Sequence, residues 1–427
     1  MFPRMVNTMN KEYDLIVIGG GSAGLAAAVG AYDAGIKSIL LIERMPQLGG
    51  ILNQCIHNGF GLHTFKEELT GPEYAHRFIN ELHDRNIEFL ISTTVLSITK
   101  TLNVTISNEE IGVTTLKAKA IVNATGCNER TFGQIMIPGD RPNGVFTAGL
   151  AQKYLNLDGY LVGKKVYILG SGDIGLIMAR RMTLEGANVI GVSELMPYSN
   201  GLNRNIVQCL NDFNIPLHLH NTVTKIIGKD QLEAIETMDV GDDLKPIPGT
   251  MKHIECDTLL LSVGLYPFNT LLQQAGARVY TKTKGAFVDQ NLETTIPGIF
   301  SCGNVLHVHD LVDFVSQEST RAGKNAADFI KAKRGKLIKT LYTNALDGVG
   351  YLLPNMIHVY SNLNEVTFSF RVRKPMQKAI LFIKDGDNVI KKITKVNLVP
   401  SEMQMVTLKD INFAQYDEID FMLEEVK

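Results

Sequence analysis

Short apolar runs alternate with helical stretches over most of the first 330 residues. The run at residues 13–18 stops at a cluster of glycines, which is followed by an alanine-rich stretch and a second apolar run at 38–42. The same order recurs, with an apolar run at 166–169, a glycine-rich turn, a helical stretch at 176–186 and another run at 189–193. Apolar runs of this length are typical of buried parallel strands, and their alternation with helices predicts an α/β fold.

The pattern changes at about residue 340. Short apolar or alternating pieces then follow one another at residues 356–360, 366–372, 379–384, 389–393, 403–408 and 419–423. This spacing predicts a small all-β domain, which we expect to be a sandwich. The tail has no glycine turn, metal-ligand spacing or nucleophile signature, so we expect it to serve docking or oligomerisation.

The first glycine turn has the spacing G-x-G-x-x-G, at Gly19, Gly21 and Gly24. In such a turn between strand and helix, the first glycine permits the tight bend, the second lets the backbone approach a pyrophosphate, and the third lets the helix pack on the strand. Glu43 ends the next apolar run, where an acidic side chain accepts hydrogen bonds from a ribose. This unit therefore predicts a Rossmann-like dinucleotide site.

A second glycine turn repeats this spacing at Gly170, Gly172 and Gly175. Glu194 ends the apolar run that follows, in the place that Glu43 takes in the first unit. A carboxylate there repels a 2′-phosphate and binds a free 2′-hydroxyl, so the sequence predicts NAD rather than NADP. Arg180 and Arg181 oppose this preference, but both fall within the helical stretch, where we expect them to face solvent.

Composition and charge exclude several classes of protein. Hydrophobic residues make up 45% of the chain and charged residues 20%, as in ordinary globular proteins. The net charge of -2 and the lack of a Lys/Arg run argue against a nucleic-acid partner. The most apolar stretch is too short and too rich in glycine for a membrane span, and no secretion signal is visible, so a cytoplasmic location is expected. The five cysteines lack metal-like spacing, and no metal site is expected.

Three further sequence motifs occur in addition to the two glycine turns. Residues 121–126 end in Ala-Thr-Gly, residues 260–267 include a corresponding glycine, and residues 295–304 read TIPGIFSCGN. Together the five motifs resemble the two-dinucleotide-binding flavoproteins, the pyridine nucleotide-disulfide oxidoreductase family that includes thioredoxin reductase, glutathione reductase and NADH oxidases. The resemblance covers residues 11–335.

This resemblance implies FAD at the first turn and NAD(H) at the second. The residues that it assigns to FAD are Gly19, Gly21, Ser22, Ala23, Gly24, Glu43, Arg44, Gly50, Val95, Thr125, Gly126, Gly303 and Asn304. Those that it assigns to NAD are Gly170, Gly172, Asp173, Ile174, Gly175, Glu194 and Gly264. Asn304 stands where the family usually has Asp, but its amide still hydrogen-bonds a ribityl hydroxyl.

A narrower likeness involves residues 137–152. They resemble flavin subunits related to opine oxidase and hydrogen cyanide synthase, and those that accompany anaerobic glycerol-3-phosphate dehydrogenase-like proteins. In such systems the subunit exchanges electrons between pyridine nucleotide and another redox component. The resemblance therefore implies a protein redox partner or second subunit, and a homo-oligomer remains an open alternative.

One cysteine lies where the family's disulfide reductases carry a redox pair. Cys55 follows Gly49 and Gly50 and has no partner cysteine nearby, so disulfide reduction by that route is not expected. The resemblance places Cys55 and His57 close to the isoalloxazine ring. Cys55 is then either a reactive thiolate favoured by the histidine or a buried and inert thiol, and we prefer the inert thiol.

Histidines and an aspartate stand at the entry to a helix predicted over 310–329. His307, His309 and Asp310 either contact flavin or substrate, or serve as capping and packing residues. The positive end of the helix dipole would favour an anionic reduced flavin.

The length of 427 residues predicts about three domains, since single cores stop growing near 250–300 residues. The order of motifs implies an FAD domain in two parts, 11–128 and 267–335, an NAD domain at 150–266 and the β domain at 340–427. Runs at 88–91, 95–98 and 103–107 are expected to form a small insertion, in which Val95 would touch adenine. We expect hydride transfer between NAD(H) and FAD and electron exchange with a partner. The alternatives are an NADH oxidase using O2 and a docking flavin subunit of a multicomponent dehydrogenase.

Overall fold

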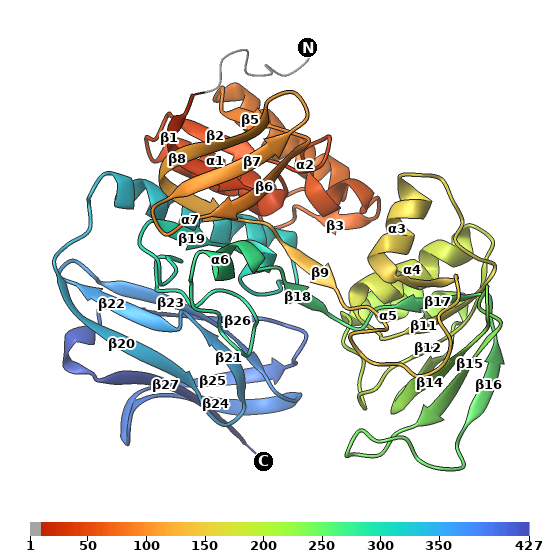
Figure 1. Cartoon of the computed structure of the whole chain (residues 1–427). Helices are drawn as coiled ribbons and strands as arrows, with labels where there is room; N and C mark the ends of the chain where they lie inside the picture. The colour runs from red at the N-terminus through yellow and green to blue at the C-terminus, as the bar shows by residue number, and fades with distance from the viewer. Residues whose placement is uncertain (1–9, 427) are drawn as a thin grey trace. The chain divides into compact units, whose positions relative to one another are not determined.

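The computed structural model describes residues 10–426, which form two compact units (Figure 1). The first unit consists of the residues up to Cys127 and those from Pro267 onward, and the second is Asn128–Tyr266. Two short strands, β9 (Cys127–Glu129) and β18 (Leu265–Pro267), pair with each other where the chain passes from one unit to the other. No helix within the described residues is both long and apolar enough to cross a membrane.

A parallel sheet forms the centre of the first unit. Its strands are, in order across the sheet, β5 (Glu88–Leu90), β2 (Ile39–Ile42), β1 (Glu12–Ile18), β8 (Gly112–Asn123) and β19 (Ile299–Ser301). Strands β6 (Thr93–Ile98) and β7 (Asn103–Asn108) extend it as an antiparallel layer on the first half of β8. The expectation that residues 88–91 belong to this insertion is wrong. Strand β5 instead follows a helical crossover and pairs in parallel with β2.

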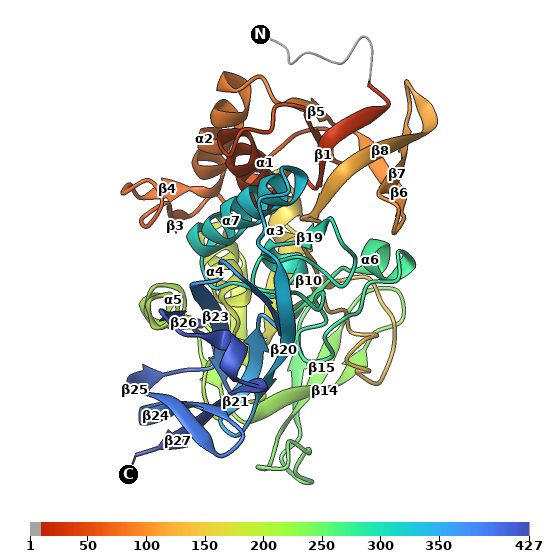
Figure 2. The same cartoon turned by 90° about the vertical axis from the view of Figure 1, so that its left-hand side faces the viewer.

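Helices cover the parallel sheet of the first unit. They are α1 (Ser22–Asp33), α2 (Gly71–Asp84) and α7 (Val312–Ile330). The short helix α6 (Thr270–Gln274) instead lies against β6, and the unit also contains the 3₁₀ turns η1 (Gly50–Gln54) and η3 (Gly303–Val305). Figure 2 shows α1 and α7 side by side. A Cβ on Gly30 would lie 2.5 Å from the carbonyl oxygen of Thr320, and one on Gly323 would lie 2.0 Å from that of Ala27. Only glycine permits so close an approach, which brings the start of α7 beside the first glycine turn.

A hairpin and a capped helix connect β2 to β5. Strands β3 (Asn58–Phe60) and β4 (Leu69–Thr70) pair with each other. Helix α2 then begins with a capping box, in which the Thr70 side chain and the Glu73 carboxylate each bond the other residue's backbone N–H.

The second unit contains another parallel sheet. Its strands are, in order, β10 (Val145–Thr147), β17 (Thr258–Leu261), β11 (Lys165–Leu169), β12 (Asn188–Ser193) and β13 (Leu217–His218). Its helices are α3 (Ala148–Asn156), α4 (Asp173–Leu184) and α5 (Asn203–Cys209), with the 3₁₀ turn η2 (Asn211–Phe213). An antiparallel sheet of β14 (Asn221–Ile227), β15 (Ala234–Asp239) and β16 (Lys252–Glu255) completes the unit. The expected strand, glycine turn, helix and strand are therefore present in both units.

The C-terminal strands, blue in Figure 1, form two sheets around one core of their own. The larger sheet contains β22 (Met356–Tyr360), β20 (Leu337–Ala345), β27 (Glu418–Glu425), β24 (Met376–Asp385) and β25 (Asn388–Leu398). The smaller contains β21 (Val349–Leu353), β23 (Glu365–Val372) and β26 (Gln404–Lys409), and a 3₁₀ turn η4 (Phe413–Gln415) precedes β27. The predicted α/β fold with a β-rich C-terminal region is confirmed. Sequence reasoning missed β20 and β21, because most side chains of β20 are not buried and its pattern is weak.

Candidate functional site

The first glycine turn has a backbone that only glycine adopts without strain. Gly19 has φ +107°, and a Cβ on Gly24 would lie 1.7 Å from the carbonyl oxygen of Gly19. Helix α1 begins directly after Gly21 without a side-chain cap. A Cβ on Gly21 would meet nothing closer than the Cα of Gly50, at 3.9 Å. The turn therefore leaves an open backbone surface at a helix N-terminus, which is the arrangement that binds phosphate groups.

Glu43 joins this turn to the end of β2. Its Oε2 accepts a hydrogen bond from the Gly20 backbone N–H at 2.6 Å, and its Oε1 accepts one from the Met45 N–H at 2.8 Å. The side chain is buried. Because each carboxylate oxygen has a second lone pair, the fixed carboxylate has room to accept ribose hydroxyls as well.

Other predicted residues gather around the same turn. Gly303 has φ +71°, and a Cβ on it would lie 2.7 Å from the Cβ of Ala23, next to Ser22 in the first turn of α1. A Cβ on Gly19 would lie 2.4 Å from the carbonyl oxygen of Ala124, so residues 124–126 also adjoin the turn. The motifs around residues 19–24, 50, 124–126 and 303 are thus brought together by the fold.

Two predicted residues lie at the margin of this group. Arg44 is exposed, directly after Glu43. Val95 is half-buried on β6, and this strand begins beside Glu43, where the Thr93 N–H donates to the Glu43 carbonyl oxygen at 3.0 Å.

Sequence reasoning missed two polar side chains at the carboxyl edge of the sheet. Asn123 at the end of β8 is in register with both Ile18 of β1 and Ser301 of β19. Within the described residues, Asn123 Nδ2 and Ser301 Oγ are buried without a hydrogen-bond partner, while Thr125 Oγ1 donates to Asn123 Oδ1 at 3.3 Å. An unpaired buried polar atom costs about 1–3 kcal/mol, so this edge fits a polar ligand. Ligands of parallel sheets bind at the carboxyl edge, so the position of both residues at the end of a predicted strand could have identified them from the sequence.

The second glycine turn repeats the geometry of the first. Gly170 has φ +96°, and a Cβ on it would lie 2.1 Å from the carbonyl oxygen of Ser262. Glu194 Oε2 accepts hydrogen bonds from Ser171 N at 3.0 Å and Ser171 Oγ at 2.6 Å, and Oε1 accepts from Met196 N at 3.0 Å. Ser262, which was not predicted, accepts from the Gly175 N–H at 3.1 Å and ties α4 to the end of β17.

Further residues around this turn have structural contacts. Asp173 Oδ1 accepts from Leu202 N at 2.8 Å and from Asn205 Nδ2 at 2.7 Å, which holds the segment after β12 at the start of α4. Ile174 packs against the core of the unit, and Gly264 has φ +99° with open space where a Cβ would be.

The two arginines of α4 face solvent or have structural partners. Arg180 is exposed, as expected. Arg181 forms an ion pair with Glu185 at 2.8 Å and donates to Asn156 Oδ1 at 3.0 Å.

Cys55 lies just after η1 in surroundings that disfavour a thiolate. Burial raises the pKa of its thiol to about 12, so the neutral form prevails near pH 7. The thiol donates to the Ile51 carbonyl oxygen at 3.3 Å. His57 Nδ1 lies 2.9 Å from the Asn58 carbonyl oxygen, and its ring lies 4.9 Å from that of Phe60. No two of the five cysteines have the C-x2-C or C-x4-C spacing of a redox pair. This environment supports the inert alternative for Cys55.

The loop after Cys55 is fixed by a side chain of α7 that was not singled out from the sequence. Asp313 is buried in the first turn of α7. Its Oδ2 accepts from Gly61 N at 3.2 Å and its Oδ1 accepts from Thr64 N at 2.7 Å. The first turn of α7 therefore positions the loop that follows His57.

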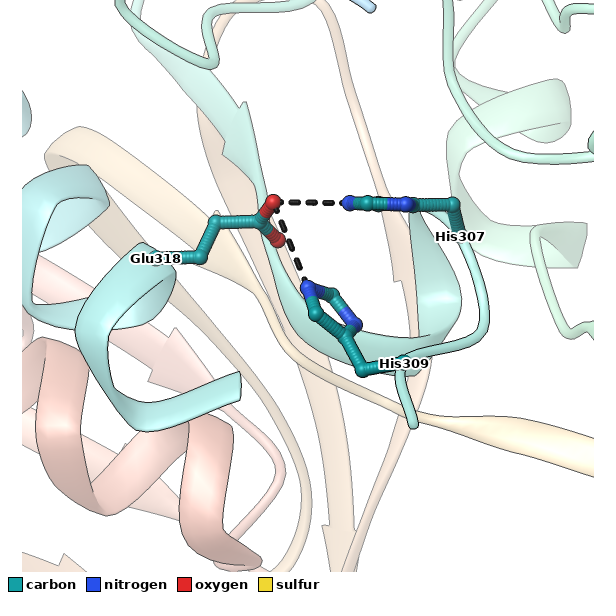
Figure 3. A group of neighbouring side chains, drawn as sticks. All are labelled: His307, His309 and Glu318. Carbon is teal, nitrogen blue, oxygen red and sulfur yellow. Dashed lines mark hydrogen bonds and ion pairs between the residues drawn. The ribbon is translucent and has the colours of Figure 1, made fainter. Parts of the chain in front are cut away.

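His307, His309 and Glu318 form a buried cluster between η3 and α7 (Figure 3). His307 Nε2 lies 2.8 Å from Glu318 Oε2, and His309 Nε2 lies 3.4 Å from the same oxygen. Glu318 Oε1 accepts from the Gly303 N–H at 2.9 Å. Asn304 Oδ1 accepts from the backbone N–H of His309 at 3.1 Å and lies 3.2 Å from His309 Nδ1. The carboxylate thus holds the backbone of the segment that the sequence assigned to FAD.

Burial and charge act in opposite directions on this cluster. Burial alone would raise the pKa of the Glu318 carboxyl, but the two histidines outweigh it and hold that pKa well below its ordinary value. Burial lowers the pKa of His307, even though the Glu318 carboxylate favours its charged form. The arrangement is therefore an ionised carboxylate that accepts a hydrogen bond from a neutral His307.

The β domain contributes to the same cluster. Tyr351 of β21 places its hydroxyl 3.0 Å from His307 Nδ1. Arg371 of β23 forms an ion pair with Asp310 and donates to the Val308 carbonyl oxygen at 3.0 Å. Asp310 Oδ2 also accepts from Met403 N at 2.6 Å. These contacts support the packing alternative for His307 and Asp310 and tie the β domain to residues 307–310. The docking or oligomerisation role expected for the β domain stays a prediction.

Comparison with known proteins gives consistent matches. Residues 13–327 match the family described as pyridine nucleotide-disulphide oxidoreductase. One subunit of the alkyl hydroperoxide reductase from Staphylococcus aureus is 26% identical over 333 residues, which are 75% of this chain and 60% of that protein. The chain therefore spans about 60% of the length of the curated relatives that it matches.

Solved structures agree with this match. Thioredoxin reductase from T. acidophilum has a TM-score of 0.61 at 25% identity, covering 76% of this chain and 99% of that one. The bacillithiol disulfide reductase from Bacillus cereus has a TM-score of 0.60 at 18% identity, covering 75% and 99%, which shows a shared fold. Since the family match includes both glycine turns and most of the 427 residues, the chain belongs to the pyridine nucleotide-disulphide oxidoreductase family, whose members are FAD-dependent NAD(P)H oxidoreductases.

Proposed function

We propose that this protein transfers hydride between NAD(H) and FAD and exchanges the electrons with a protein redox partner, without an internal redox-active disulfide. The observation that carries the proposal is the duplicated turn in a chain whose five cysteines include no C-x2-C or C-x4-C pair. In each unit a buried glutamate bonds the glycine turn with one oxygen and the backbone two residues later with the other. Such a pair of units suits two dinucleotides, and thiol–disulfide exchange requires a resolving thiol.

The residues around the first turn would hold FAD. In this proposal the FAD domain consists of residues 11–128 and 267–335. The open backbone at Gly21 and the N-terminus of α1 would receive the pyrophosphate, and Glu43 would receive the ribose. Among residues 10–426, Asn123 Nδ2 and Ser301 Oγ have no hydrogen-bond partner at the same sheet edge, which is the fit expected for a polar cofactor. FAD supplies a ring that accepts and releases hydride, and the chain binds and orients it.

The residues around the second turn, in a domain at 150–266, would hold NAD(H). Glu194 is already bound to Ser171 through two hydrogen bonds, so its carboxylate is fixed in place. A fixed negative charge there favours NAD over NADP. The exposure of Arg180 and the ion pair of Arg181 leave no reason to assign either residue to a 2′-phosphate.

A protein partner is the finer part of the proposal. Residues 137–152 resemble flavin subunits of multicomponent systems, and the curated relative is named as one subunit of an alkyl hydroperoxide reductase. A chain without a cysteine pair needs another acceptor or donor for its electrons. The odd number and wide scatter of the five cysteines suit a reducing compartment, which supports the expected cytoplasmic location.

Anaerobic mixing with NADH tests the proposal. The FAD-loaded protein is expected to lose its flavin absorption when mixed with NADH in a stopped-flow instrument, and NADPH at the same concentration is expected to react more slowly. Retention of the flavin absorption with both nucleotides would contradict the proposal. Subsequent return of the absorption with O2 alone, at the rate of steady-state turnover, would favour the oxidase alternative.

Cys55→Ser is expected to leave flavin reduction and steady-state NADH oxidation unchanged within about twofold, because a thiol with a raised pKa is a poor nucleophile. Slow alkylation of Cys55 by iodoacetamide at pH 7.5, followed by mass spectrometry, checks the same property. A loss of turnover by more than about tenfold in Cys55→Ser, with FAD content unchanged, would place the thiol in the mechanism.

A further inference from the structure

We propose that His307, His309 and Glu318 bind a divalent transition-metal ion of the Zn²⁺ or Fe²⁺ class. One ring nitrogen from each histidine and one carboxylate oxygen lie within 4.8 Å of one another, and all three residues are buried. Figure 3 shows both rings turning a nitrogen toward the Glu318 carboxylate. With metal–ligand distances of about 2.0–2.2 Å, the ligand atoms of a tetrahedral site lie roughly 3.3–3.6 Å apart. The observed separations of 2.8 and 3.4 Å require only small side-chain adjustments.

An unpartnered nitrogen at the centre of the cluster points to a cation. Asn304 Oδ1 accepts the backbone N–H of His309, so this atom is an oxygen, and it also receives the proton of His309 Nδ1. The other ring nitrogen, Nε2, faces the Glu318 carboxylate. His309 Nε2 is buried without a hydrogen-bond partner in the described residues, and it lies 3.4 Å from a carboxylate oxygen. A cation held between this nitrogen and the carboxylate oxygen would be a ligand-bound partner for both atoms.

Outer contacts hold both rings in the required orientation. Metal-binding histidines commonly hydrogen-bond through their other ring nitrogen, which fixes the tautomer. Here Asn304 Oδ1 hydrogen-bonds His309 Nδ1, and the Tyr351 hydroxyl hydrogen-bonds His307 Nδ1. A metal ion at His307 Nε2 requires the ring proton on Nδ1, where it would be donated to the Tyr351 oxygen while the Tyr351 hydroxyl hydrogen turns away from the ring.

The set of ligands selects the class of ion. Two imidazole nitrogens and one carboxylate oxygen suit Zn²⁺ or Fe²⁺, whereas Ca²⁺ and Mg²⁺ prefer sites made of oxygens. Glu318 Oε1 is occupied by the Gly303 N–H, so Oε2 is the coordinating atom. An ion there would link the 303–309 segment, α7 and, through Tyr351, the β domain. The proposed hydride transfer between NAD(H) and FAD does not require this ion, so the metal site and the hydride transfer can be tested separately.

Metal uptake by the FAD-loaded protein tests the site. After chelator treatment and its removal, titration with ZnSO₄ is expected to show about one bound ion per chain by calorimetry and elemental analysis. CoCl₂ in place of zinc is expected to give visible bands of a four-coordinate site at wavelengths beyond the flavin absorption. The melting temperature is expected to rise with either ion, because the ion binds only the folded chain.

Variants show whether the metal ion binds at this cluster or at other histidines of the protein. His309→Gln and Glu318→Gln are each expected to weaken binding by ~100-fold or more, and Tyr351→Phe, which keeps the volume, by about 10- to 100-fold. His358→Gln is the matched control, since His358 Nδ1 lies 3.3 Å from Asp289 Oδ2 without a second histidine, and it is expected to bind like the wild type. The proposal is overturned if the wild type takes up neither ion, or if folded Tyr351→Phe and His309→Gln bind as tightly as the wild type.

Discussion

Gly21→Ala is expected to lower the affinity for FAD by ~100-fold or more while leaving the apoprotein folded. The added Cβ has space in the protein itself, since its nearest neighbour is the Gly50 Cα at 3.9 Å and Gly21 has φ -79°. The same Cβ would occupy the surface where a pyrophosphate must approach the backbone. Loss of two hydrogen bonds to a charged group, at about 1.5–3 kcal/mol each, corresponds to a factor of this size.

Fluorescence titration of the apoprotein with FAD measures this effect, and thermal unfolding of the apoprotein checks the fold. Gly133→Ala is the matched control, because Gly133 is exposed, lies outside both turns and has room for a Cβ. Gly24→Ala gives a useful contrast. Its Cβ would lie 1.7 Å from the Gly19 carbonyl oxygen, so this variant is expected to destabilise the apoprotein itself. Wild-type FAD affinity in Gly21→Ala would contradict the assignment of FAD to the first turn.

Gly172→Ala is expected to slow reduction of the bound flavin by NADH ~100-fold at low NADH concentration, with FAD content unchanged. Gly172 has φ -66°, and its Cβ would lie 3.2 Å from Ser262 Oγ, so a shift of a few tenths of an ångström relieves the contact and keeps the hydrogen bond that Ser262 Oγ accepts from the Gly175 N–H. The local fold should therefore persist, while the approach of the nucleotide pyrophosphate is blocked. The defect should fall mainly on apparent nucleotide affinity rather than on the limiting rate.

Stopped-flow reduction over a range of NADH concentrations separates these two effects. The Gly133→Ala protein again serves as the control for a glycine replacement in the second unit. If the rate of flavin reduction in Gly172→Ala depends on NADH concentration as in the wild type, the second turn does not bind the nucleotide. Loss of FAD from this variant would instead assign FAD, not NAD(H), to the second turn.

The sequence by itself determined the two dinucleotide units, because their geometry is local. A buried strand, a glycine turn and a helix follow one another within 22 residues in the first unit and 20 in the second, and the glutamate comes at the end of the next strand. The positive φ of Gly19 and Gly170 and the bonds of Glu43 and Glu194 to the turns follow from this order. The lack of a cysteine pair could likewise be read directly from residue positions.

Only the tertiary structure decided which distant side chains meet. Asn123 and Ser301 come together because β8 and β19 are neighbours in register, and no local pattern encodes that pairing. The cluster of His307, His309 and Glu318 could not be predicted either, because a loop and the first turn of α7 separate Glu318 from the two histidines in the sequence. Its carboxylate comes from the second turn of α7, whose position depends on close packing against α1, and Tyr351 comes from the β domain. Contacts between segments far apart in sequence arise from packing and strand register, and these are properties of the whole fold.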